Sequence, residues 1–248
     1  MSTTIIIPTY NEADNIGPLI DSLEKILTNF IAEQEELESF NILVVDSNSP
    51  DGTGDVVREK IKEFDNLRII SGPKQGLGAD TIRGIRYALE KLEADVVVTM
   101  DADFSHNPED VPRLVSKVLN GADYVIGSRY VEGGSIPSNW GLHRKFLSFF
   151  GNLLARILGV WEVHDQTPAF RAMRREVLEK IDFEGLPDGY AFQIGLVCRA
   201  HGVGAKFAEV PIHFTDRERG QSKMPVSTIL DTLGFLVNYR LTKIFGEG

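Results

Sequence analysis

Near the middle of the chain lies the run Val96-Val-Val-Thr-Met-Asp-Ala-Asp103. Its first five residues are apolar or β-branched, which is typical of a central strand buried on both faces. Two aspartates follow where such a strand would end. A second run, Ile42-Leu-Val-Val-Asp46, has the same form. Because ligands in open α/β sheets collect at the carboxyl ends of the strands, we expect these aspartates to face one cleft.

Similar apolar runs recur along the first half of the chain and alternate with segments of helical period. We expect strands at Thr4–Ile7, Asn41–Asp46, Leu67–Ser71, Asp95–Asp101 and Asp123–Gly127, and helices near 13–29, 53–63, 79–93 and 108–119. This alternation predicts an α/β fold in which a mostly parallel sheet is covered by helices on both faces.

The second half of the chain has a different character from about residue 130 onward. It contains Gly133-Gly134, Pro137 and a basic amphipathic segment, followed by expected short strands near 167–173 and 205–214 and a final helix near 225–245. There is no internal repeat or flexible linker. We therefore expect the second half to complete the cleft of the first half.

The composition excludes several classes of protein. The chain has 248 residues, 42% of them hydrophobic, so one α/β domain can bury a substantial core. Cys198 is the only cysteine, which excludes an internal disulfide and a four-cysteine metal site and favours a reducing cytoplasm. A net charge of -10 would repel a nucleic-acid backbone or an anionic membrane, so any anionic ligand must be held by local basic groups. We see no signal peptide and no apolar stretch of about 18 residues, so we expect no transmembrane domain.

The strongest chemical signal is the pair Asp101 and Asp103. Two carboxylates two residues apart at a strand end can approach one hard cation, and Mg²⁺ or Mn²⁺ suits such oxygen ligands, usually shared with substrate phosphates. The alternative is a pair of solvated aspartates in a loop or at a helix N-cap. The position after a central strand favours the metal interpretation.

Three further clusters carry weaker signals. Pro8-Thr-Tyr-Asn-Glu12 follows the first strand, and Tyr10 offers a flat face for a base, although Asn11 could simply cap a helix. Asp46-Ser-Asn-Ser-Pro-Asp-Gly-Thr53 is dense in turn-forming residues. Lys74-Gln-Gly-Leu-Gly78 is too short for a P-loop.

Taken in order, these runs are more specific than any one of them. With these runs in this order, the chain resembles the family-2 glycosyltransferases over residues 4 to about 224. Further residues follow in the order of the family: Gly127-Ser-Arg-Tyr130, Trp140, Arg144, Phe170-Arg171 and the run from Asp216 to Lys223. Within that family it is most similar to the dolichyl-phosphate mannose synthases.

The resemblance implies a GT-A fold over residues 1–224, a divalent cation, and inverting transfer of mannose from GDP-mannose to dolichyl (polyprenyl) phosphate. On the donor side, the resemblance implies a nucleoside pocket lined by Pro8, Tyr10, Glu12 and Asp46, and diphosphate contacts from Asp101, Ala102 and Asp103. It implies that the metal is bound by Asp101, Asp103 and Ser105, and that a loop near the nucleotide sugar contains Arg217 and Lys223. On the acceptor side, it implies that the phosphate is bound by Arg129 and Arg144. Asp101, Asp103, Arg129 and Arg217 would be the catalytic residues.

The proposed acceptor makes this assignment chemically coherent. A phosphate monoester is ionised near pH 7 because its second pKa is about 6, so no catalytic base is required. The reaction needs stabilisation of the leaving group and arginines that orient the acceptor. Between residues 129 and 161 four basic side chains face one acidic side chain, a local balance of +3 that suits anion recognition. Each arginine could instead form an ordinary surface ion pair.

Two segments raise the question of membrane contact. Residues 142–161 place aromatic and aliphatic side chains at helical spacing beside Lys145 and Arg156, which fits either an interfacial helix or a core-facing helix. Residues 225–248 form a second amphipathic segment. Since the acceptor tail lies in the bilayer, the resemblance implies peripheral association with the cytoplasmic face of a membrane.

Several positions depart from the family pattern and leave alternatives open. Ser47 stands where a second aspartate is usual, Pro168-Ala169 replaces Ser-Gly, and Gly195 replaces an acidic residue. The same reaction with UDP-glucose or another hexose donor therefore remains an alternative, as does a non-catalytic, membrane-peripheral binding protein on the same fold. A phosphatase with an Asp-x-Asp pair is disfavoured because Phe104 stands where Thr or Val typically follows.

Overall fold

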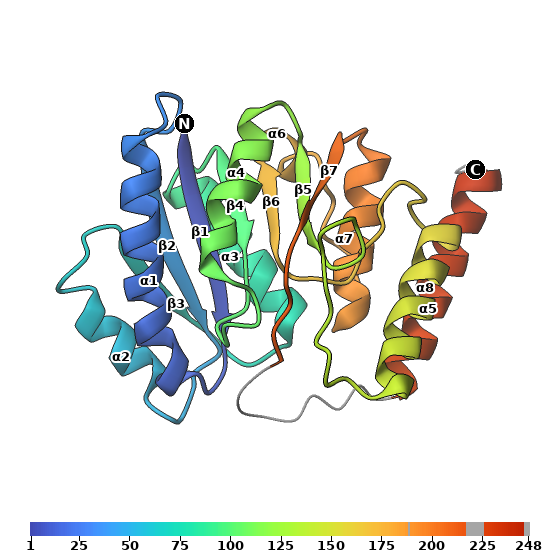
Figure 1. Ribbon diagram of the computed structural model, residues 1–248, viewed down its shortest axis with the longest axis horizontal. Helices are drawn as coiled ribbons and strands as arrows, with labels where there is room; N and C mark the ends of the chain where they lie inside the picture. Colours follow the sequence, from blue (N-terminus) through green and yellow to red (C-terminus); the bar gives the residue numbers. More distant parts are fainter. Residues whose placement is uncertain (188, 217–225, 246–248) are drawn as a thin grey trace.

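A single seven-stranded sheet organises the chain, in the order β3-β2-β1-β4-β6-β5-β7 (Figure 1). The computed structural model describes residues 1–187, 189–216 and 226–245. The strands are β1 (Ser2–Thr9), β2 (Ser39–Asp46), β3 (Leu67–Ser71), β4 (Val96–Thr99), β5 (Tyr124–Ser128), β6 (Arg171–Arg174) and β7 (Phe207–Pro211). Only β6 runs antiparallel to its neighbours, so the sheet is mostly parallel, as the sequence predicts.

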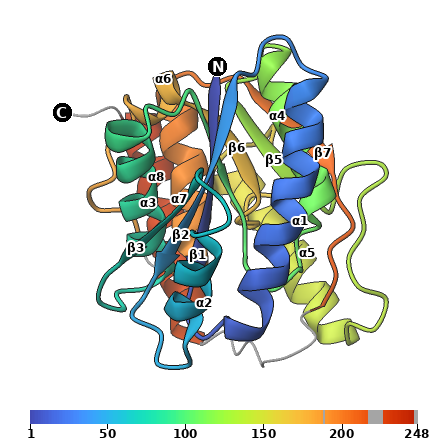
Figure 2. The same cartoon turned by 90° about the vertical axis from the view of Figure 1, so that its left-hand side faces the viewer.

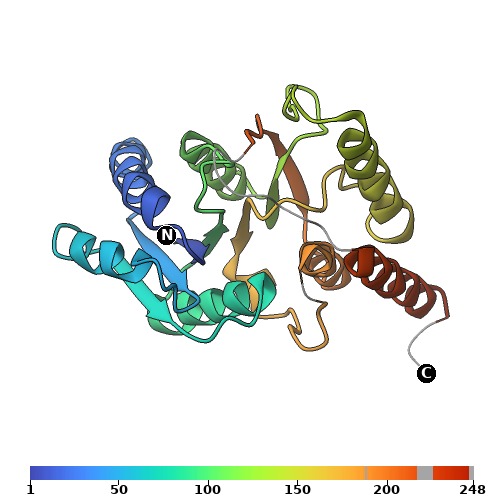
Figure 3. The same ribbon diagram turned by 90° about the horizontal axis from the view of Figure 1, so that it is seen from below.

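Helices cover both faces of the sheet (Figures 2 and 3). They are α1 (Ala13–Ala32), α2 (Thr53–Lys60), α3 (Leu77–Lys91), the short 3-10 helix η1 (Pro108–Asp110), α4 (Val111–Leu119), α5 (Leu142–Leu158), α6 (Arg175–Leu178), α7 (Tyr190–Gly202) and α8 (Val226–Phe245). Successive side chains of a strand point to opposite faces of the sheet. In β1, Ile5 and Ile7 pack with α1 and α4 on one face, and Ile6 packs with α3 and α7 on the other.

The topology gathers the predicted site at one edge of the sheet. Strands β1, β2, β4, β5 and β7 run in the same direction, since β6 is antiparallel to both β4 and β5. Their carboxyl ends therefore lie at the same edge, viewed directly in Figure 3. The segments that leave β1 at Thr9, β2 at Asp46, β4 at Thr99 and β5 at Ser128 all start there.

Helix α7 is absent from the sequence prediction for a physical reason. Residues Ala191 to Cys198 are all buried, so the helix is enclosed on every side and has no polar stripe. Without alternation between apolar and polar faces, the sequence carries no helical period to detect. The enclosure also explains one departure from the family pattern, because a Cβ at Gly195 would lie only 2.9 Å from the Leu186 side chain and 3.1 Å from Pro187.

The predicted strand near 167–173 begins later than expected, at Arg171. This arginine is fully buried, and its guanidinium donates to the carbonyls of Pro168, Gln166 and Gln193 and to the Tyr124 hydroxyl. The residues before β6 therefore curl around a buried cation instead of extending along the sheet. Four acceptors compensate the charge for its loss of hydration.

Helix α5 exposes its large apolar side chains. Only Asn152 and Ala155 are buried on this helix, and Asn152 accepts a hydrogen bond from the backbone N–H of Gln166. Facing solvent are Leu142, Phe146, Leu147, Phe149, Phe150, Leu154 and Ile157, together with Trp161 just beyond the helix. The sequence allows an interfacial helix or a core-facing helix, and the exposed apolar face of α5 is not that of a core-facing helix.

Helix α8 behaves differently from α5. In its central part, Leu236 is buried and Phe235 and Tyr239 pack against the core on the α7 side of the sheet, while Val237 and Leu241 are exposed. Among the described residues, neither α8 nor any other helix combines the length and apolarity that crossing a bilayer requires.

Candidate active site

The loop after β1 and the loop after β2 are fastened to each other. Asn11 adopts a left-handed backbone conformation (φ 62°), and its N–H donates to Ser49 Oγ at 3.0 Å. The N–H of Glu12 donates to Thr53 Oγ1 at 2.9 Å. The amide groups just before α1 thus find partners in the second loop, and no Asn11 side-chain cap is formed.

Asp51 completes this junction. Its carboxylate accepts from the N–H of Ala13 at 3.0 Å and from both the N–H and the hydroxyl of Thr53. Burial acts to raise the pKa of Asp51, but these hydrogen bonds outweigh it and lower the pKa below its ordinary value. The turn-forming run after β2 therefore holds the loops after β1 and β2 together at the carboxyl edge of the sheet.

Asp46 lies at the end of β2 with only 3% of its surface exposed. Its carboxylate accepts from Ser49 Oγ at 2.6 Å, from the Ser49 N–H at 3.1 Å and from Thr9 Oγ1 at 3.3 Å. In this arrangement Asp46 fixes the shape of the loop that would surround a nucleoside. Pro8 pairs with Val45 on the adjacent strand, one residue before Thr9.

Tyr10 is 40% exposed, and the Lys74 ammonium lies 3.4 Å from the centroid of its ring. An aromatic face at the edge of the sheet is suited to base stacking, and the lysine beside it is suited to an anion. The sequence alone assigns no role to the run that begins at Lys74. The signal was a basic residue in a glycine-rich turn after β3.

The turn after β4 holds Asp101 and Asp103 by local hydrogen bonds. Asp103 Oδ1 accepts from the hydroxyl of Ser105 at 2.6 Å and from its N–H at 3.1 Å. Phe104 takes the left-handed conformation (φ 58°) that this tight turn needs. Ala102 and Ser105 are buried, whereas the Asp101 side chain keeps 24% of its surface exposed.

His106 supports this turn from the interior. It is 1% exposed, stacks on Phe170 with ring centroids 5.0 Å apart, and accepts the Asp101 N–H at Nδ1, 3.1 Å away. Because Nδ1 is an acceptor, the proton of the neutral ring is assigned to Nε2. Nothing in the sequence alone indicates that His106 positions the backbone of Asp101.

The donor set of this turn fits a hard divalent cation that shares its ligands with a substrate. Among the described residues there is no cluster of three His, Cys, Asp or Glu side chains that could hold a metal alone. Mg²⁺ and Mn²⁺ commonly bind through one or two carboxylates, with substrate phosphates and water completing the shell. Asp101 and Asp103 match that pattern, and Ser105 uses its hydroxyl to orient Asp103.

Arg129, directly after β5, is held by a buried carboxylate. Its Nε lies 2.7 Å from Asp165 Oδ2 and its Nη2 lies 2.8 Å from Asp165 Oδ1, with a further bond to Thr167 Oγ1 at 2.6 Å. Burial acts to raise the pKa of Asp165, but the Arg129 guanidinium and its hydrogen bonds lower that pKa below its ordinary value. The bidentate pair fixes the guanidinium plane.

Arg144 occupies a more open position near the start of α5. Its Nη1 lies 3.1 Å from Asp216 Oδ1, and its guanidinium carbon lies 3.9 Å from the Trp140 ring centroid. The arginine side chain keeps 44% of its surface exposed. It is therefore oriented by an aromatic face and a surface carboxylate, without being enclosed.

Phe214, which follows β7, connects these parts. Its ring lies 5.7 Å from His106, 6.0 Å from Trp140 and 5.4 Å from the Arg129 guanidinium carbon. Its neighbour Thr215 donates its hydroxyl to the Phe104 carbonyl at 3.0 Å. Residues 214–216 thus contact the turn after β4, Arg129 and Arg144, and so bring the aspartate turn and both predicted acceptor arginines together. Arg217 and Lys223, which the resemblance places in the site, lie outside the described residues.

The chain matches the model of glycosyl transferase family 2 over residues 4–182. It belongs to this family. The chain is 42% identical over 234 residues to a polyprenol monophosphomannose synthase of Mycolicibacterium smegmatis, covering 93% of this chain and 84% of the relative. It is 39% identical over 226 residues to an undecaprenyl-phosphate mannosyltransferase of Micrococcus luteus, covering 90% and 88%. It is 34% identical to a dolichol-phosphate mannosyltransferase of Pyrococcus furiosus, covering all of this chain and 65% of that protein.

Solved structures of glycosyltransferases show the same fold. The chain aligns with mannosyl-3-phosphoglycerate synthase from Rubrobacter xylanophilus at a TM-score of 0.64 and 21% identity, covering 100% of this chain and 76% of that one. It aligns with mannosyltransferase PcManGT from Pyrobaculum calidifontis, solved with GDP-Man and Mn²⁺, at 0.58 and 19%, covering 99% and 64%. The predicted GT-A fold and the predicted family are confirmed, and this family member is a glycosyltransferase.

Proposed function

We propose that this glycosyltransferase moves mannose from GDP-mannose to a polyprenyl phosphate such as dolichyl phosphate, with inversion and with the help of Mg²⁺ or Mn²⁺. The relatives named as polyprenyl-phosphate mannosyltransferases support the sugar and the acceptor. A solved neighbour that holds GDP-Man and Mn²⁺ supports the donor and the cation. The observation that carries the proposal is the preorganised pair Asp101 and Asp103 at the carboxyl edge of the sheet.

In this proposal the first half of the chain binds the donor. Tyr10 would stack on the base, Lys74 would approach the nucleotide from the same side, and Asp46 would hold the loop that surrounds the nucleoside. Pro8 and Glu12 would line this pocket. Asp101 and Asp103, with Ala102 between them, would face the diphosphate. A bound cation would supply charge neutralisation of the departing nucleoside diphosphate.

The second half of the chain would orient the acceptor. Arg144, half-exposed on Trp140, would bind phosphate oxygens directly, and Arg129, fixed by Asp165, would present a rigid guanidinium beside them. The phosphate monoester is already ionised near neutral pH, so these residues need only align it with the anomeric carbon. We propose roles for Arg217 and Lys223 near the nucleotide sugar on the basis of the family pattern alone.

The acceptor also implies a membrane surface. A polyprenyl tail stays in the bilayer, and the exposed aromatic face of α5 begins beside Arg144. We propose that this face enters the lipid interface and that the protein associates peripherally with the cytoplasmic side of a membrane. Phe146 and Phe150, whose ring centroids are 4.0 Å apart, would form the centre of the contact.

A donor panel tests the proposed reaction. Purified chain is incubated with Mg²⁺ or Mn²⁺, a short polyprenyl phosphate, and either GDP-mannose, UDP-glucose or another nucleotide hexose, and the lipid-linked product is measured by mass spectrometry. We expect product with GDP-mannose and none without a divalent cation. Product from UDP-glucose alone would overturn the donor, and the absence of lipid product with every donor would overturn the function.

A further inference from the structure

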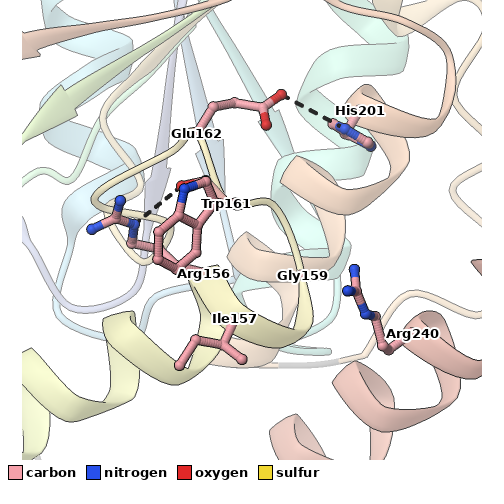
Figure 4. A pocket seen from close by; sticks show the side chains of 7 residues that line it. All are labelled: Arg156, Ile157, Gly159, Trp161, Glu162, His201 and Arg240. Atoms are coloured by element: carbon pink, nitrogen blue, oxygen red, sulfur yellow. Dashed lines mark hydrogen bonds and ion pairs between the residues drawn. The ribbon is translucent and has the colours of Figure 1, made fainter.

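A second candidate site lies at the far end of α5 from Arg144. A cavity of about 250 Å³ opens between the end of α5, the end of α7 and the side of α8 (Figure 4). Its walls include Arg156, Ile157, Trp161, His201 and Arg240. Three basic or potentially basic side chains, Arg156, His201 and Arg240, therefore line one cavity in a chain whose net charge is -10.

The acid-base balance of this cavity favours an anion. Glu162 is its single acidic residue, and it lies 3.6 Å from His201 Nε2. Arg156 donates to the Trp161 carbonyl at 3.1 Å and stacks on the Trp161 ring at 4.7 Å. Among the described residues, neither Arg156 nor Arg240 forms an ion pair with a carboxylate. The two guanidinium groups thus leave an excess of positive charge on the cavity.

The cavity is continuous with the exposed apolar face of α5. Ile157 and Trp161 line the cavity and are 49% and 61% exposed. From Phe146 through Phe150 and Leu154 to Ile157 the apolar side chains of α5 follow helical spacing, so they form one stripe, and Trp161, beyond the end of the helix, lines the cavity together with Ile157. The helix itself spans 17 residues, or about 26 Å at 1.5 Å per residue. A soluble anion would not need this apolar approach, whereas a phospholipid would use both parts.

We propose that this cavity binds the phosphate-bearing headgroup of an anionic phospholipid. The inference rests on the membrane contact of α5 put forward above. With a lipid headgroup in this cavity and the acceptor phosphate at Arg144, both ends of α5 would meet lipid phosphates of the membrane interface. The helix would then lie parallel to the membrane, and the acceptor end would be held at headgroup level.

Vesicle binding tests the proposal with the full chain. Sedimentation is measured with phosphatidylcholine vesicles and with vesicles that also contain phosphatidylglycerol, for the wild type, the double variant Arg156→Gln/Arg240→Gln, and the control Arg86→Gln. Arg86 is an exposed arginine of α3 and changes the charge without touching the cavity. Thermal unfolding checks that all variants fold.

We expect anionic lipid to tighten binding of the wild type, and the double variant to lose about fivefold of that preference per arginine removed. The Arg86→Gln variant should lose no more than twofold. An unchanged preference in the double variant would overturn the headgroup site. So would a wild type that binds both vesicles equally, and in that case the membrane contact of α5 would stand.

Two arms separate this site from the proposed function. If neither the wild type nor the Phe150→Ser variant sediments with either kind of vesicle, the membrane contact of α5 is wrong. The headgroup site is then overturned as well, because it depends on that contact. If inorganic phosphate at constant ionic strength abolishes the anionic preference at millimolar concentration, the site takes free phosphate and the lipid assignment is overturned. Transfer to a short, water-soluble polyprenyl phosphate should be the same for the wild type and the double variant.

Discussion

The two halves of the molecule hold their charged side chains in different ways. In the first half, Asp46 and Asp103 receive hydrogen bonds from Ser49 and Ser105, two or three residues further along the chain. In the second half, Arg129 is held by a residue 36 positions away and Arg144 by one 72 positions away. The aspartates of the proposed donor side are thus held mainly by local turns, whereas the arginines of the proposed acceptor side are held by contacts between distant segments.

This difference predicts which substitutions reduce activity without reducing the stability of the fold. A local turn keeps its shape when one charge is neutralised, because its backbone hydrogen bonds survive. A buried ion pair between distant segments does not, because the remaining charge is left without compensation. A neutral substitution should therefore impair catalysis alone at the aspartates of the first half, and both folding and catalysis at the buried pair Arg129–Asp165 of the second half.

The largest effect on stability is expected at Asp165. Replacing Asp165 with Ala leaves the Arg129 guanidinium, 9% exposed, without its carboxylate. Breaking a buried pair on one side costs about 3–5 kcal/mol, so the free energy of unfolding should fall by that amount in urea denaturation. Replacement of Asp55, which pairs with Arg58 at the surface, is the matched control and should cost less than about 1 kcal/mol. Equal losses at the two positions would remove the contrast.

The same carboxylate predicts a dependence on pH. The pKa of Asp165 is lower in the folded chain than in the unfolded chain, so its contribution is present above the unfolded value of about 3.9 and is lost as the pH falls through the folded value. Unfolding monitored between pH 6 and pH 3 should therefore show a steeper loss of stability in the wild type than in Asp165→Asn. Parallel pH profiles would contradict the assignment.

In the first half, Asp103→Asn should leave the fold intact and remove activity. The amide can still accept from Ser105, so the melting temperature should change by little. Losing one carboxylate of the cation site should lower the rate of mannose transfer about 10²–10³-fold. Asp55→Asn again serves as the control, with wild-type rates. Full activity of Asp103→Asn would exclude this residue from the donor site.

At the acceptor end, Arg144→Gln should raise the KM for the polyprenyl phosphate about tenfold while the KM for the nucleotide sugar stays the same. Arg144 is 44% exposed, so stability should change by less than about 1 kcal/mol. Arg144→Lys should recover only part of the loss, because an ammonium lacks the bidentate fork. A larger effect on the donor than on the acceptor would reverse the roles of the two halves.

The smallest effect is expected at Tyr10. Loss of base stacking in Tyr10→Ala should weaken GDP binding about fivefold, measured by titration calorimetry, and Tyr10→Phe should bind like the wild type because it keeps the aromatic face. Equal weakening in both variants would point to the hydroxyl, and an unaffected Tyr10→Ala would place the base elsewhere.

The same contrast explains what could be predicted from sequence. The apolar runs before Asp46 and Asp101 indicated the central strands and the sheet edge at which we propose that ligands bind, because strand period and strand ends are local properties. The roles of Asp165, Phe214 and Glu209 had no local signal. Glu209 on β7 accepts hydrogen bonds from the N–H groups of His164 and Asp165, and so positions the carboxylate that holds Arg129.

Some helices could be predicted from the sequence pattern and others could not. The amphipathic pattern of α1 and α3 was visible, whereas α7 is buried all round and carried no period. For α5 the pattern was visible but its direction was not, because periodicity cannot tell whether an apolar stripe faces the core or the outside. Asn152, buried and bonded to the backbone of Gln166, decides that the stripe faces outward.

The proposed reaction depends on one contact, in which the turn at Asp101 and Asp103 holds the nucleotide through a divalent cation. Titration calorimetry of GDP with and without Mn²⁺, on the wild type and on Asp103→Asn, tests it most directly. We predict that Mn²⁺ tightens GDP binding at least about tenfold in the wild type and has no effect in the variant. Equal tightening by Mn²⁺ in both proteins would contradict it.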